Sequence, residues 1–152
     1  MGEVLFYEKQ QFKQWWLWLL LAAVSIYISI NKYLNSVDFT YAAFTVGTVI
    51  LLFLVIKLET KITRDGIYVR FFPFNIGYKF HSWNTISKAY VKEYRPLADY
   101  GGWGFRYSFI NGRALNISGN KGLQLEFIDG SKLLIGTAKE KELEDTLMRL
   151  NP

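Results

Sequence analysis

The sequence predicts an α+β membrane protein, with two transmembrane helices at the N-terminal end and a β domain closed by one C-terminal helix. Three observations predict it. Apolar residues gather in the first third of the 152-residue chain, which is 51% hydrophobic overall. Short runs of β-branched and aromatic residues, separated by turn residues, begin near residue 57. The last residues have the spacing of an amphipathic helix. We therefore expect a cytoplasmic N-terminal segment (1–13), a helical hairpin (14–56) and a β domain (57–152).

Two uncharged runs, residues 14–31 and 39–56, predict the transmembrane helices. Each run has eighteen residues. At about 1.5 Å per helical residue such a run reaches roughly 27 Å, close to the ~30 Å hydrocarbon core of a bilayer. The absence of charge inside either run argues against an ion or substrate pathway. Aromatic residues fit the headgroup levels at the ends of the runs: Trp15, Trp16, Trp18, Tyr33 and Tyr41.

Other interpretations of these runs agree less well with the sequence. A soluble helical bundle would leave only residues 57–152 to cover two helices that are apolar on every side. A cleaved signal peptide would end near Ala23, but the apolar run continues to Ile30 and a second run follows. Small residues permit close helix packing, either within the hairpin or between copies of the chain: Ala22, Ser25, Ser29, Ala43 and Gly47.

Positive residues that flank the runs predict the orientation. Lys9 and Lys13 precede the first run, and Lys32 alone lies in the turn. Four cations follow the second run: Lys57, Lys61, Arg64 and Arg70. Because cytoplasmic flanks carry the excess of Lys and Arg, we expect a multi-pass protein of the inner cell membrane with both termini in the cytoplasm.

The β domain is predicted to contain about seven or eight antiparallel strands. Turn residues at 64–66, 73–75, 111–112 and 129–131 separate them, and the glycines of 119–122 are expected to form a further hairpin turn. The expected strands lie around Ile62 and over residues 67–71, 76–80, 86–94, 105–110, 113–117, 123–128 and 132–135.

One helix is expected to close the domain. Thr137 and Glu140 have the spacing of a capping box, and three leucines then mark one apolar face: Leu143, Leu147 and Leu150. About seven antiparallel strands with such a helix fit a small barrel or a pair of orthogonal sheets.

Four short motifs occur in order along this domain: L-x-x-K-I-T-x-D-G-I-x-V-R at 58–70, S-W-x-x-I at 82–86, Y-G-G-W-G-F-R at 100–106 and L-I-G-T at 134–137. In this order they resemble bacterial pleckstrin-homology-like domains. The N-terminal run 6–18 is similar to small bacterial membrane proteins in which such a domain follows a two-helix hairpin. The resemblance implies a barrel of seven strands capped by a helix, in a group whose members mostly have no established biochemical activity.

Residues that could carry catalysis or bind a metal are sparse. His81 is the single histidine and cysteine is absent, so no cluster of metal ligands is expected. Ser108 and Ser118 lack a G-x-S-x-G motif. The glycines around Trp103 lack the spacing of a phosphate-binding loop. We expect no catalytic residue, no metal, no cofactor and no enzymatic activity.

Charge is distributed unevenly over the β domain. Residues 57–113 carry ten Lys and Arg and four acidic residues, whereas residues 114–152 carry five and six. The cations after the second run are candidate contacts for the bilayer surface or anionic lipids, and are equally consistent with a topology signal only: Lys57, Lys61 and Arg64. One loop is the candidate surface for a partner protein: Tyr100, Gly101, Gly102, Trp103, Gly104 and Arg106.

The sequence favours a non-enzymatic, membrane-anchored binding module that engages a membrane-protein partner or anionic lipid headgroups through its cytoplasmic β domain. The alternative is a structural subunit that self-associates as a homo-oligomer or packs on a larger membrane complex. A modest net charge of +5 and a membrane tether argue against nucleic acid as a partner.

Overall fold

The chain is an α+β protein with an apolar N-terminal helix and a sheet-rich domain. The computed structural model describes residues 3–12, 15–35 and 40–150. Two units make up the chain: a helical unit, Phe12–Ile56, and a β domain formed by Met1–Gln11 together with Lys57–Pro152. The β domain therefore begins before the helices and resumes after them, so a boundary at Lys57 leaves out its first strand.

The helical unit contains α1 (Trp15–Asn35) and α2 (Thr40–Val55). Among the described residues, one helix, Trp15–Leu34, is long and apolar enough to cross a membrane by length and composition. The first helix is longer than predicted, whereas α2 has 16 residues and ends before Ile56. The predicted ends at residues 14 and 39 lie outside the described residues. Ile56 is buried and the chain then enters a strand, which explains why α2 is shorter than its apolar run.

Hydroxyl groups inside α1 and α2 bond to their own helix. The Ser25 hydroxyl donates to the Leu21 carbonyl at 2.8 Å, and the Thr48 hydroxyl donates to the Phe44 carbonyl at 2.9 Å. Such bonds satisfy hydroxyl groups within helices that are otherwise apolar. Small residues from both helices line a groove of about 210 Å³ between them: Ser25, Ser29, Ala43 and Gly47.

The first sheet has the order β1-β2-β3-β4, and all of its pairs are antiparallel. Its strands are β1 (Val4–Gln11), β2 (Lys57–Thr63), β3 (Gly66–Phe72) and β4 (Lys79–Ser82). The predicted hairpin around residues 64–66 is present as β2 and β3. Gly66 is required there, because a Cβ atom would lie 2.3 Å from the His81 carbonyl oxygen.

Strand β1 was not predicted. Its buried positions are Phe6, Glu8 and Gln10, so two polar residues stand where an apolar pattern would have indicated a strand. Antiparallel pairing places Gln11 opposite Lys57. The residues immediately before and after the helical unit are therefore neighbours in this sheet.

The second sheet has the order β5-β8-β9-β7-β6. Its strands are β5 (Ile86–Glu93), β6 (Gly104–Ser108), β7 (Gly112–Asn116), β8 (Lys121–Phe127) and β9 (Lys132–Gly136). The prediction that all strands run antiparallel was wrong, because β7 is parallel to β9. The expected hairpin turn at residues 119–122 was also wrong, because β7 and β8 on either side of it are not neighbours in the sheet. The tight turn after β8 pairs β8 with β9, so β7 can reach only the other edge of β9.

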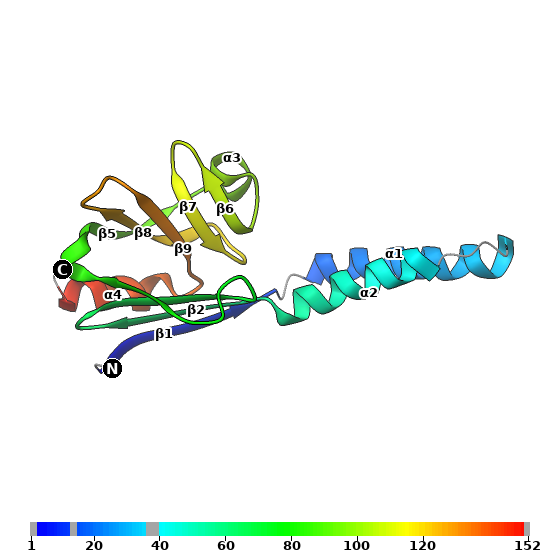
Figure 1. Cartoon of the computed structure of the whole chain (residues 1–152), viewed down its shortest axis with the longest axis horizontal. Helices are drawn as coiled ribbons and strands as arrows, with labels where there is room; N and C mark the ends of the chain where they lie inside the picture. The colour runs from blue at the N-terminus through cyan, green and yellow to red at the C-terminus, as the bar shows by residue number, and fades with distance from the viewer. Residues whose placement is uncertain (1–2, 13–14, 36–39, 151–152) are drawn as a thin grey trace. The chain divides into compact units, whose positions relative to one another are not determined.

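The described residues thus form nine strands in two separate sheets, and the expected barrel is not closed. The core lies between the sheets and includes Leu58, Ile62, Phe71, Leu125 and Leu134, all fully buried. Three helical elements complete the domain: η1 (Trp83–Thr85), α3 (Pro96–Tyr100) and α4 (Glu140–Leu150). Figure 1 shows α4 in red, packed against β1 of the first sheet and β5 of the second.

The predicted apolar face of α4 is present, since Leu143 and Leu147 are buried. The start of the helix differs from a capping box. The Thr137 hydroxyl accepts from the Lys139 N–H at 3.0 Å, but Glu140 pairs with Lys121 at 3.0 Å.

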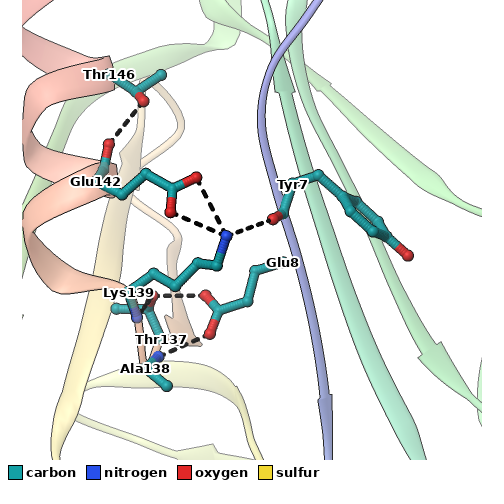
Figure 2. Close-up of polar contacts among 7 residues, drawn as sticks. All are labelled: Tyr7, Glu8, Thr137, Ala138, Lys139, Glu142 and Thr146. Carbon is teal, nitrogen blue, oxygen red and sulfur yellow. Dashed lines mark hydrogen bonds and ion pairs between the residues drawn. The ribbon is translucent and has the colours of Figure 1, made fainter.

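The chain just before α4 is instead stabilised by Glu8 of β1, as Figure 2 shows. Its carboxylate accepts from the Thr137 hydroxyl at 2.6 Å and from the Ala138 N–H at 2.8 Å. Lys139 also donates to the Tyr7 carbonyl at 3.3 Å. The first strand is therefore joined to the turn before the last helix by charge-assisted hydrogen bonds that the buried Glu8 carboxylate accepts.

Candidate functional site

The three cations predicted to face the bilayer lie along β2 and the turn that follows it. Lys57 is the first residue of β2, Lys61 is in its middle and Arg64 lies beyond its end. At about 3.3 Å per residue, Arg64 is roughly 23 Å along the strand from Lys57. Arg64 instead pairs with Glu3 at 3.7 Å. Because β2 is extended, the three do not form one cluster, and only Lys57 directly follows the helical unit.

Strand alternation and register gather a different set of cations. Lys57, Glu59 and Lys61 occupy the same side of β2. Lys9 and Arg70 both lie opposite Glu59, on β1 and β3. We call the resulting surface the basic face: Tyr7, Lys9, Lys57, Glu59, Lys61, Tyr68, Arg70 and Tyr78. Sequence spacing did not reveal it, because its members lie up to 71 positions apart and meet only through pairing of β1, β2 and β3.

The one carboxylate of the basic face is neutralised. Glu59 is buried and accepts a hydrogen bond from Arg70 Nη2 at 2.8 Å and another from the Tyr78 hydroxyl. Burial by itself would raise the pKa of Glu59, but the bonds from Tyr78 and Arg70 outweigh it and the pKa is lowered. The Glu59 charge is therefore balanced by Arg70, which leaves three lysines as the net charge of this surface.

No carboxylate pairs with these lysines among the described residues; Lys9 is exposed, and Lys57 and Lys61 are half-exposed. Lys61 Nζ lies 4.4 Å from the centre of the Tyr78 ring and 5.6 Å from that of Tyr7, so aromatic faces hold its ammonium group. Within the described part of the chain, neither Lys9 nor Lys57 has an ion-pair partner.

The loop predicted to bind a partner uses most of its groups inside the domain. Gly101 ends α3 in the left-handed conformation, with φ of 71°. Trp103 Nε1 donates to the Gly119 carbonyl at 3.1 Å, and Arg106 Nε donates to the Trp103 carbonyl at 3.0 Å. The N–H of Gly104 donates to Asn116 at 2.8 Å. These bonds fix the connection between α3 and β6, and Arg106 remains exposed.

Tyr100 lies at the buried end of this loop, and its substitution by phenylalanine is expected to reduce the loss of stability at high pH. Burial, then the charge of Asp99 and the neighbouring Tyr94 and Tyr90, raises the pKa of Tyr100 from 10.0 to about 12. The unfolded chain releases this proton near pH 10.0, so stability is complete below that pH and is lost as the pH rises toward 12.

Urea unfolding at about pH 9 and about pH 11 measures this effect. The wild-type protein should lose more stability between the two than the Tyr100→Phe variant. Tyr107→Phe is the control, because Tyr107 is 63% exposed. Equal losses in wild type and Tyr100→Phe would contradict the assignment.

Comparison with protein-family models, with curated proteins and with solved structures gives no match for this chain. In the parts of the chain that the structure describes, no three His, Asp or Glu side chains lie together as a metal site would need. The basic face has one clear chemical property, a net positive charge that attracts anions.

Proposed function

We propose that this protein is a non-enzymatic binding module, anchored in the membrane, whose basic face docks on anionic lipid headgroups. The observation that carries the proposal is one sheet face on which Lys9, Lys57 and Lys61 remain after Arg70 balances Glu59. A lysine near an anionic leaflet contributes about 1 kcal/mol, so three contribute about 3 kcal/mol, on the order of a hundredfold in affinity.

Strand pairing supports the proposed anchor. Gln11 lies opposite Lys57, so the two ends of the helical unit leave the domain at adjacent points. A segment whose ends are held together on one side of a bilayer must cross it an even number of times. Two crossings by α1 and α2, with both termini in the cytoplasm, satisfy this condition. At 16 residues α2 reaches about 24 Å, which a locally thinner bilayer accommodates at modest cost.

The strand order also supports the proposed likeness to pleckstrin-homology-like domains. Strands β1 to β4 form one antiparallel sheet, and β5, β8 and β9 are antiparallel neighbours in the other. These are seven strands followed by a helix, as the resemblance implies, with the β6–β7 hairpin as an insertion at the edge of β9.

The alternatives have less support. Self-association would use the small residues of α1 and α2, but Ser25, Ser29, Ala43 and Gly47 line the groove within the hairpin. A partner protein at residues 100–106 would meet a loop in which Trp103 is bonded to its own domain. On the basic face, by contrast, Lys9 and Lys57 have no ion-pair partner among the described residues.

A labelling experiment on the full chain tests the proposal. The sequence has no cysteine, so Tyr68→Cys, beside Lys61 on the basic face, introduces a unique spin-label site. In nanodiscs that contain anionic lipid, this label should lie near the headgroups, and high salt or the triple variant Lys9→Gln, Lys57→Gln, Lys61→Gln should displace it. Lys88→Cys, at an exposed position of β5, is the control label. The same label depth in neutral and anionic nanodiscs would refute lipid docking.

A further inference from the structure

A small cleft opens between the two sheets, with β4 on one side and the β6–β7 hairpin on the other. Its polar lining consists of Asn75, Lys79, His81 and Arg113, and its apolar lining consists of Val69, Phe105, Leu115 and Leu133. The cleft has a volume of about 30 Å³, which is room for two or three waters. An oxyanion would therefore place two or three of its oxygens inside the cleft and the rest at its opening.

Sheet register explains how the three basic side chains meet. Lys79 and His81 lie two positions apart on β4 and so share one side of that strand. Arg113 comes from β7 of the other sheet, beside Leu133 of β9. None of these three residues belongs to the basic face, which is on the opposite side of the first sheet.

The charges around the cleft are almost entirely positive. No carboxylate is among the described residues that line it. Asp129 interacts with Arg113, but its pKa is lowered mainly by hydrogen bonds from Ser131 and only in part by the charge of Arg113. Two permanent cations and a histidine thus surround one small space, and their mutual repulsion is not relieved by an acid inside it.

We propose that this cleft binds a phosphate-type oxyanion. Lys79 and Arg113 supply charged donors, the guanidinium in the fork that suits tetrahedral oxyanions, and His81 and the Asn75 amide supply further donors. The proposal goes beyond docking on the bilayer and does not rest on it, because it involves another face and other residues.

The pKa of His81 is expected to respond to a bound anion. Burial, then the charges of Arg113 and Lys79, lowers its pKa below the usual 6.5, so the ring is neutral at pH 7. An anion between His81 and the two cations reverses that repulsion and raises the pKa of His81.

An apolar shelf beside the cleft offers a place for the remainder of a phosphate ester. The rings of Phe74 and Phe105 are stacked with centres 6.1 Å apart, and Tyr107 meets Phe109 edge to face at 5.5 Å. Phe109 is 97% exposed and the adjacent Ile110 is 83% exposed. The phosphate could therefore belong to a lipid headgroup or to a soluble ester, and the experiment separates these sources.

The single histidine makes the test direct. The full chain, prepared without a histidine tag and with ¹³C-labelled histidine, is kept in a maltoside detergent and phosphate-free buffer, and the imidazole signal of His81 is titrated with pH. Inorganic phosphate should move the midpoint to higher pH, whereas chloride at equal ionic strength should not. In mixed micelles, phosphatidic acid is compared with phosphatidylcholine as the lipid source.

The variants decide whether the cleft is responsible. Arg113→Gln should weaken the phosphate response about tenfold, since it removes a charge-assisted contact. Arg149→Gln, which removes an exposed charge from α4, should leave the response unchanged. Circular dichroism checks that both variants fold. A response to phosphatidic acid alone assigns the site to lipid. No response to either probe, an equal response to chloride, or an equal response in Arg113→Gln overturns the proposal.

Discussion

Replacing residues 12–56 by an Asn-Gly turn is expected to leave the β domain folded and soluble, whereas removing residues 1–56 is expected to unfold it. Gln11 and Lys57 are directly opposite in the sheet, and Asn-Gly is the preferred two-residue connection between antiparallel strands. The larger deletion takes away β1 and with it Phe6, which is 2% exposed. Loss of a buried phenylalanine alone costs about 3–5 kcal/mol, against a total of about 5–15 kcal/mol for a small domain.

Near-ultraviolet circular dichroism and thermal unfolding distinguish the two chains. The chain with the turn should unfold cooperatively. The chain that begins at Lys57 should lack fixed aromatic signals and regain them when a peptide of residues 3–11 is added. A cooperative transition at the same temperature in both chains would show that β1 contributes nothing to the domain.

Substituting Glu8 by alanine is expected to destabilise the β domain by about 3 kcal/mol. The substitution removes the acceptor for the Thr137 hydroxyl and the Ala138 N–H, and hydrogen bonds to a charged group contribute roughly 1.5–3 kcal/mol each. It also detaches β1 from the start of α4.

Urea unfolding of the chain in which the Asn-Gly turn replaces residues 12–56 gives the measurement. Glu3→Ala is the matched control, because Glu3 is an exposed glutamate near the same end of the chain whose pairing with Arg64 is worth at most about 1 kcal/mol. Similar losses for the two substitutions would contradict a structural role of Glu8.

Sequence pattern was sufficient where an element is built from neighbouring residues. The β2–β3 and β8–β9 hairpins follow from strand-forming residues around a short turn, and α4 follows from leucines at helical spacing. In each case the partner of a residue lies within 15 positions along the chain, so the pattern that specifies the element is local.

Elements that depend on distant partners were missed. In β1, Glu8 and Gln10 face the core because Thr137 and the Gly136 carbonyl bond to them from the far end of the chain. The parallel pairing of β7 with β9 likewise depends on β8, because β8 occupies one edge of β9 and leaves only the other edge for β7. The basic face has the same origin, since Lys9 meets Glu59 only through the β1–β2 pairing.

The pairing of β1 with β2 has a consequence for how the chain is made. During synthesis β1 leaves the ribosome with no partner, because the helical residues 12–56 must follow before β2 exists. In the proposed membrane anchor, β1 and β2 can pair only when both lie on the same side of the bilayer, so insertion of the helices and folding of the domain would be coupled. A chain with β1 and β2 on opposite sides would lose the whole β1–β2 ladder. On this proposal, folding of the domain would select the topology in which both strands lie on one side.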